Sequence, residues 1–154
     1  MGLHKRNGFT IIELLIVIAI ILIIAAVAIP KLTQARRSAF EMAAIRTLQT
    51  LNTAQVQYFS TYGRFAQTLL ELGPSSGNAP PTTAASDLIG EDLSTGLKSG
   101  YVFTMVGTPR GYTINADPQV FEVTGSRSFY TDYTNSIRVH LGNEPASAND
   151  SEIK

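Results

Sequence analysis

Cysteine is absent from the 154 residues of this chain, and neither sign of charge prevails in it. Without a thiol the protein cannot form a disulfide, use thiolate chemistry or attach a c-type haem, and it needs no oxidising compartment. Lysine plus arginine number 12, and aspartate plus glutamate also number 12. A chain balanced in this way has no strong general attraction to nucleic acid. The composition thus excludes thiol enzymes and gives no indication of a nucleic-acid site.

Motifs for catalysis or nucleotide binding are also lacking. The sequence contains no P-loop and no G-x-G-x-x-G fingerprint. The stretch GPSSG, from Gly73 to Gly77, formally matches the G-x-S-x-G motif of hydrolases, whose serine must lie between a strand and a helix. Here Pro74 and the pair Pro80–Pro81 favour a surface loop instead. We therefore predict a protein that is not an enzyme and that has no cofactor.

Candidate metal ligands are few. The two histidines are His4 and His140. Only His140 lies on a predicted strand, and one histidine there cannot make a two-histidine site. Asp132 and Asn135 could contribute to a calcium site in a loop of the predicted sheet, but Ca²⁺ takes roughly six to eight oxygen ligands. We therefore predict no metal site and keep Asp132 and Asn135 as the candidates for one.

The segment from Phe9 to Ile29, FTIIELLIVIAIILIIAAVAI, is apolar except for Thr10 and Glu13 and contains neither glycine nor proline. A helix of this length is about 31 Å long, close to the hydrocarbon thickness of a bilayer. It has no polar face, unlike an amphipathic helix of a soluble protein. A helix buried in a protein core is the alternative, but the rest of the chain is too small to surround it. We therefore predict a transmembrane helix over residues 9–29.

Glu13 is the acidic residue of this segment. A carboxylate deep in a membrane helix costs about 2.5 to 3.5 kcal/mol on insertion scales, and such residues are usually paired and functional. Alternatively, Glu13 lies close enough to the membrane edge to stay hydrated, since the apolar run from Leu14 to Ile29 is still long enough to span. Composition by itself does not choose between these two interpretations.

The residues before the apolar segment favour the paired, functional glutamate. Met1 to Gly8, MGLHKRNG, include Lys5 and Arg6 and contain no acid. An ordinary secretory signal has a shorter apolar run that is closed by a small-residue cleavage site, and this chain has neither feature. The order KRNG|FTIIELL resembles the prepilin signature of type IV pilins and of the pseudopilins of type II secretion.

The resemblance has consequences for individual residues. In that family a membrane peptidase cuts after the glycine, and the new N-terminal residue is N-methylated. The resemblance therefore implies a leader peptide over residues 1–8, cleavage between Gly8 and Phe9, methylation of Phe9 and a functional carboxylate at Glu13. Pro30 also matches the family pattern. Leu22 departs from it, because many members have a glycine midway between the glutamate and the proline, so unravelling of the helix on assembly is left open.

Residues 30–62 are predicted to continue the helix outside the membrane. Pro30 removes a backbone donor and crowds the preceding turn, so a kink or local break is expected there. Gly63 suits a stop just past Tyr62. One stripe of mostly apolar residues should pack on a head domain, and it comprises Ile45, Leu48, Leu51, Gln55, Val56, Phe59 and Tyr62. Polar residues expected mostly off the stripe are Arg36, Arg37, Glu41, Arg46, Gln49 and Asn52.

The rest of the chain divides into a connecting loop region over residues 63–98, a sheet over 99–142 and a frayed tail over 143–154. Short β-branched and aromatic runs predict antiparallel strands at Tyr101–Val106, Gly111–Ala116, Arg127–Thr131 and Ile137–Leu141. Either face of the first strand could be the buried one. The predicted fold is α+β: a long N-terminal spine helix, its first half in the membrane, packed against a C-terminal antiparallel β-sheet, as in pilins.

The function that the resemblance implies is structural. A subunit of a type IV pilus would wait in the bacterial inner membrane, be cut by the prepilin peptidase and methyltransferase, and be polymerised by an inner-membrane assembly platform. Its partners would be the lipid bilayer, itself and other pilins, and its final location an extracellular pilus. Two alternatives stay open: a type II secretion pseudopilin, which would remain periplasmic, and a single-pass anchored binding domain that never polymerises.

Overall fold

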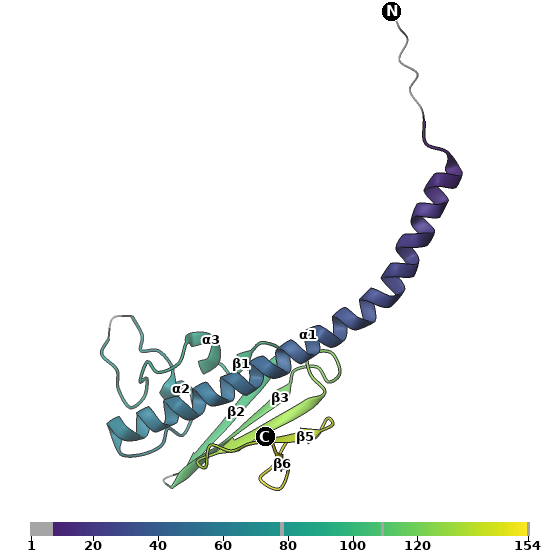
Figure 1. Ribbon diagram of the computed structural model, residues 1–154. Helices are drawn as coiled ribbons and strands as arrows, with labels where there is room; N and C mark the ends of the chain where they lie inside the picture. The colour runs from purple at the N-terminus through teal and green to yellow at the C-terminus, as the bar shows by residue number, and fades with distance from the viewer. Residues whose placement is uncertain (1–7, 78, 109, 154) are drawn as a thin grey trace, which may run out of the picture. The chain divides into compact units, whose positions relative to one another are not determined.

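The computed structural model describes residues 8–77, 79–108 and 110–153 (Figure 1). It forms two compact units, divided between Ala35 and Arg36, which are described separately below. Its helices are α1 (Ile11–Tyr62), α2 (Leu69–Leu72) and α3 (Glu91–Ser94). Its strands are β1 (Leu97–Lys98), β2 (Tyr101–Thr108), β3 (Gly111–Pro118), β4 (Arg127–Asp132), β5 (Ile137–Leu141) and β6 (Ser151–Glu152).

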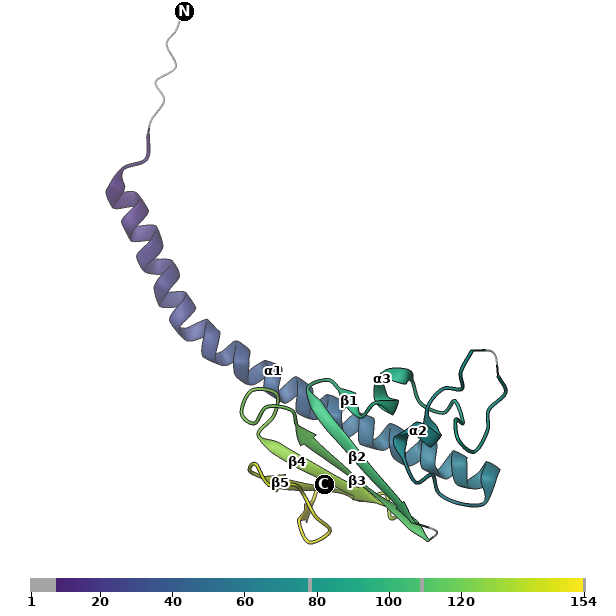
Figure 2. The ribbon, with the colours of Figure 1, turned by 180° about the vertical axis from the view of Figure 1, so that it is seen from behind.

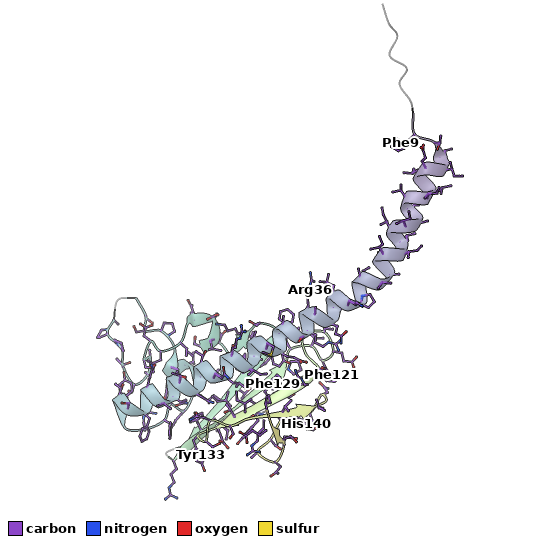
Figure 3. All side chains as sticks on the ribbon, viewed as in Figure 1. Phe9, Arg36, Phe121, Phe129, Tyr133 and His140 are labelled. Atoms are coloured by element: carbon purple, nitrogen blue, oxygen red, sulfur yellow. The ribbon has the colours of Figure 1, made fainter. Side chains whose placement is uncertain are left out.

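In the N-terminal unit, the first part of α1 is a bare apolar helix. Its side chains from Ile11 to Ala35 are exposed apart from the half-buried Ala25. Figure 3 shows these side chains projecting on all sides. In the described chain, α1 is the one helix long and apolar enough to cross a membrane, and its most apolar stretch is not buried at all. A core helix of a soluble protein would be covered, so the exposure argues against that alternative.

The helix continues through Pro30. The expected local break is therefore not found, whereas a kink stays a prediction. Pro30 has no N–H to donate to the preceding turn. The carbonyl that loses this donor belongs to Ala26, four residues earlier. The helical hydrogen bonds of the neighbouring turns carry the helix past the proline. The Thr33 hydroxyl donates separately to the carbonyl of Ile29 at 3.2 Å.

The C-terminal unit contains a six-stranded antiparallel sheet whose strands follow one another in chain order (Figure 2). Each strand pairs with the next, and the central hairpin of β2 and β3 is in register from Tyr101 opposite Pro118 to Thr108 opposite Gly111. The part of α1 after Arg36 packs against this sheet, and its buried side chains share one core with those of β2, β3 and β4. The predicted α+β fold of a long helix on an antiparallel sheet is confirmed.

The sheet also answers the question of which face of β2 is buried. Tyr101, Phe103 and Met105 are buried, whereas Thr104 and Val106 face outward. All four predicted strands are present, most of them slightly longer than expected. The sequence did not indicate β1 or β6, because a two-residue strand is too short to display an alternating pattern.

The packing stripe on α1 was only partly predicted. Leu48, Leu51 and Gln55 are fully buried as expected. Val56 and Phe59, however, are about half exposed, and Tyr58 is buried in their place. The Phe59 ring instead packs at the surface against Phe65, with ring centroids 4.7 Å apart. The buried stripe is therefore rotated toward Tyr58.

Glu41 and Asn52 are the second correction to the stripe. Both were expected off the packing face, but they are only 5% and 6% exposed. Each is buried because the sheet supplies a partner, and buried polar groups with hydrogen-bond partners are tolerated. The Asn52 amide donates to the hydroxyl of Thr131 at 2.9 Å, and the hydroxyl of Tyr112 donates to the Asn52 carbonyl oxygen at 3.1 Å.

Two chain segments outside the sheet complete the description. α1 ends at Tyr62, and Gly63 follows with φ of 70°, as the expected glycine stop requires. The expected frayed tail is wrong for the described residues. Strand β6 pairs with β5, Ala146 is buried, and the amide of Asn115 donates a hydrogen bond to the Ala146 carbonyl at 2.7 Å.

Candidate assembly site at the start of the helix

Helix α1 begins with three reciprocal hydrogen bonds between Thr10 and Glu13. The Thr10 hydroxyl oxygen accepts a hydrogen bond from the backbone N–H of Glu13 at 3.3 Å. The Glu13 carboxylate oxygen Oε2 accepts from both the backbone N–H and the hydroxyl of Thr10, each at 2.8 Å. This arrangement is a capping box, in which the residue before the helix and the third helical residue satisfy each other's free N–H groups. Glu13 thus has a role within its own chain.

The capping box turns the Glu13 carboxylate back toward the N-terminal end of the helix. Gly8 and Phe9 come just before the helix, and the Phe9 side chain is 92% exposed (Figure 3). An exposed peptide outside regular structure is the kind of site that proteases cut. The structure thus places Gly8, Phe9 and Glu13 within one short segment, whereas the proposed leader residues 1–7 lie outside the described residues. Pro30 lies about 26 Å further along the helix.

Thr10 is the residue of this site that was missed. The signal was present, because a threonine followed three residues later by a glutamate, just before an apolar run, is the sequence signature of a capping box. The cost of placing the Glu13 carboxylate in a membrane does not by itself point to Thr10 as its partner. Since Glu13 uses Oε2 for both contacts with Thr10, a further donor can still approach the other carboxylate oxygen.

A second polar site fastens the sheet to α1 in the C-terminal unit. Glu41 accepts hydrogen bonds from the backbone and hydroxyl of Ser126 at 2.9 and 3.0 Å, and from Nε and Nη2 of Arg127 at 2.8 and 2.6 Å. Burial by itself would raise the pKa of Glu41, but the hydrogen bonds from Ser126 and Arg127 bring it below its ordinary value. The carboxylate therefore stays charged although it is almost fully buried. Its hydrogen bonds hold Ser126 and Arg127 against α1, and we call these three residues the clamp.

The metal candidates Asp132 and Asn135 are occupied by the protein's own donors. Asp132 accepts hydrogen bonds from the backbone and hydroxyl of Thr134 at 2.9 and 2.6 Å. The Tyr112 hydroxyl lies 3.2 Å from the Asn135 side-chain oxygen. Among the residues that the structure describes, no three acidic, histidine or cysteine side chains gather as a metal site would require. Asp132 and Asn135 therefore brace the turn between β4 and β5.

His140 contacts an acidic residue of the C-terminal segment. Its Nδ1 lies 2.9 Å from Oδ1 of Asp150. Asp150 also accepts hydrogen bonds from the backbone and hydroxyl of Ser147 through Oδ2. The contact with His140, followed by those with Ser147, lowers the pKa of Asp150 to about 2. This contact holds the end of the chain against β5, so the sole histidine of the described chain has a structural role.

Comparison with known proteins bears on the N-terminal segment. The family model described as "Prokaryotic N-terminal methylation motif" matches residues 3–29. The type IV major pilin protein PilA of Myxococcus xanthus (strain DK1622) is 41% identical over 76 residues, which cover 48% of this chain and 34% of that protein. Over these residues the chain is thus similar to proteins with an N-terminal methylation motif and to a type IV major pilin. Gly8, Phe9 and Glu13 all lie within the matched motif.

The extent of the likeness is limited. The match spans about a third of the length of the Myxococcus pilin. No solved structure matches the chain. The pilin-like arrangement of the sheet on α1 is therefore known from the chain's own structure.

Proposed function

We propose that this chain is a structural subunit of a type IV pilus. The observation that carries the proposal is a bare apolar helix, exposed on all sides from Ile11 to Ile29, with a carboxylate cap at its first turn. Burying one leucine or isoleucine side chain is worth about 1.5–3 kcal/mol. A surface of this size needs lipid before assembly and neighbouring helices afterwards. The N-terminal methylation motif and the Myxococcus pilin support the same role.

The proposed sequence of events begins in the bacterial inner membrane. The prepilin peptidase cuts between Gly8 and Phe9, and the exposed amine of Phe9 is methylated. An inner-membrane assembly platform then lifts the subunit out of the bilayer into a filament of this pilin and other pilins, at the cell surface. Pro30 gives the helix a kink on the way. Catalysis by the subunit has no part in this scheme.

Glu13 provides the check on correct assembly. Cleavage turns the backbone nitrogen of Phe9 into an ammonium, which lies four residues from Glu13 along the chain. The carboxylate pairs with that ammonium, of its own chain or of a neighbour, through the oxygen that Thr10 leaves free. A buried charge without a partner costs several kcal/mol, so an uncut or misplaced subunit is rejected.

Three variants test the pairing in cells that retain the processing peptidase. Glu13→Gln keeps an oxygen that can cap Thr10 but removes the charge, whereas Glu13→Ala removes both. Thr10→Val keeps the charge and removes the hydroxyl from the cap. We expect Glu13→Gln and Glu13→Ala to be cleaved normally yet to give few filaments, and Thr10→Val to assemble better than either. Normal filament yield from both Glu13 variants would rule out the pairing.

A pseudopilin of type II secretion would share every N-terminal feature. The likeness to a major pilin favours the pilus. Electron microscopy of the cells separates the two, since a pilus extends from the surface and a pseudopilus stays in the periplasm. An anchored binding domain that never polymerises would instead keep its first eight residues or lose them to a different peptidase.

A further inference from the structure

Exposed aliphatic side chains gather at one end of the C-terminal unit. Val120 and Val123, in the loop between β3 and β4, are 51% and 59% exposed, and Leu141, the last residue of β5, is 77% exposed. Leu141 pairs with Arg127, and the next residue, Gly142, donates to the carbonyl of Ser126, so the end of β5 adjoins the end of this loop. We name Val120, Val123 and Leu141 the aliphatic edge.

The loop that carries the two valines is internally braced. The backbone N–H groups of Val123 and Thr124 both donate to the carbonyl of Val120, at 3.1 and 2.9 Å. The hydroxyl of Thr124 donates to the same carbonyl, and the N–H of Glu122 donates to the carbonyl of Gly125 at 2.7 Å. Glu122 adopts φ of 63°, a conformation that a non-glycine residue rarely takes. The outward direction of Val120 and Val123 is therefore built into the loop.

The aliphatic edge lies where α1 enters the unit. The Arg37 guanidinium donates a hydrogen bond to the carbonyl of Glu122, in the loop between the two valines. Figure 3 shows Phe121, of the same loop, toward the end marked by Arg36, with Tyr133 at the opposite end. Arg36 follows Ile29, the last residue of the apolar segment, by seven residues along the chain. The loop of the aliphatic edge is therefore bound to a part of α1 that is close in sequence to the proposed membrane span.

Basic residues near the aliphatic edge favour contact of this surface with anionic lipid. Lys31, Arg36 and Arg37 follow the apolar segment directly, and no acidic residue lies among them. Arg36 is exposed, and Arg37 is half-buried against the loop. Basic side chains next to a membrane helix attract the phosphates of anionic lipids, and aliphatic side chains enter the interface beside them. Glu122 is the acidic residue of the loop, so basic residues still exceed acidic ones here.

We propose that the aliphatic edge docks the C-terminal unit onto the phospholipid surface of the same bilayer that holds α1. Val120, Val123 and Leu141 enter the interface, and Arg36 contacts lipid phosphate. The unassembled subunit is thus held on the membrane at two places, and its extraction into a filament breaks both. This inference rests on the membrane insertion within the proposed function, but not on polymerisation.

The absence of cysteine makes a direct test clean, because a single introduced thiol is the only one to label. Val123→Cys, Tyr133→Cys and Ile21→Cys each receive an environment-sensitive nitrobenzoxadiazole dye in the full chain. Each is reconstituted in vesicles of phosphatidylethanolamine and phosphatidylglycerol that carry a nitroxide on the upper acyl chain. Tyr133 is 60% exposed at the opposite end of the unit and is the matched control, and Ile21 reports insertion of the span.

We expect dye at Val123 to emit at shorter wavelength and to be quenched at least about twofold more than dye at Tyr133. Adding Arg36→Glu should reduce that quenching. Equal quenching at Val123 and Tyr133, with strong quenching at Ile21, would overturn docking and leave the proposed function standing. Loss of quenching at Ile21 would overturn both. A signal at Val123 that disappears when the protein is diluted in lipid would assign the edge to contact between copies and overturn docking.

Discussion

The side-chain amide of Gln55 forms hydrogen bonds with both backbone polar groups of Ala66. Its amide nitrogen donates to the Ala66 carbonyl at 3.0 Å, and its amide oxygen accepts from the Ala66 N–H at 2.9 Å. Both residues are fully buried, so the chain that leaves α1 is fixed against the helix it has just left. A side chain thus satisfies two buried backbone groups that no strand or helix could satisfy at this place.

Gln55→Leu should destabilise the C-terminal unit by about 2–4 kcal/mol, because it leaves the N–H and carbonyl of Ala66 buried without partners. Thermal unfolding of the full chain in detergent micelles, followed by circular dichroism, measures the change. Gln57→Leu, two residues along on the exposed face, is the matched control and should change stability by no more than about 0.5 kcal/mol. Equal stability of the two variants would show that the pair of hydrogen bonds contributes little.

Arg127→Met should destabilise the same unit by about 2 kcal/mol, because it leaves the Glu41 carboxylate buried without its cation. The cost is smaller than for a fully buried pair, since the Arg127 side chain is 36% exposed and water screens it. The double variant Glu41→Met with Arg127→Met should recover part of the loss. Arg46→Met, on the exposed face of α1, is the control. A double variant less stable than Arg127→Met would contradict this account of the clamp.

The same carboxylate predicts a dependence of stability on pH. The pKa of Glu41 is lowered in the folded state, so its contribution is present above the ordinary value of 4.5 and is lost as pH falls through the lower folded value. Unfolding measured from pH 7 down to pH 3 should show this loss in the parent protein and a shallower loss in Glu41→Gln. Glu144→Gln, at an exposed position, should retain the parent profile. Identical profiles for all three proteins would exclude Glu41 as the source.

Thr10→Val should loosen the first turn of α1 without unfolding the rest. The loss of a threonine cap costs about 0.5–2 kcal/mol, and here it acts on a helix end that is held by the bonds to Glu13. Amide hydrogen exchange in micelles should become faster at Glu13 and Leu14. Thr33→Val removes a hydroxyl from the middle of the helix and is the matched control. Unchanged exchange at Glu13 in Thr10→Val would show that the capping box does not hold this turn.

Much of the fold could be predicted because its signals are local. Three features can be recognised from short stretches of sequence. They are the apolar segment from Phe9 to Ile29, the glycine after Tyr62, and the alternating strand of Tyr101, Phe103 and Met105. The start of the helix was equally local, since Thr10 and Glu13 are three residues apart. It was missed because Glu13 was considered only as a charge in a membrane.

The remaining features depend on partners far along the chain. Glu41 finds Arg127 at a separation of 86 residues, and Asn52 finds Thr131 at a separation of 79. The hydrophobic pattern of a helix predicts that such polar residues are exposed. It gives no information about the hydrogen bonds to distant residues that allow them to be buried. The aliphatic edge could not be predicted for the same reason, since the end of β5 at Leu141 comes next to the loop of Val120 only once β4 and β5 have paired.

The mass of the N-terminal peptide of the protein purified from its native membranes or filaments tests the central claim most directly. If the chain is a processed pilin, digestion and mass spectrometry will give a peptide that begins at Phe9 with one added methyl group. A peptide that retains residues of the segment 1–8, or that begins elsewhere without methylation, would contradict the account.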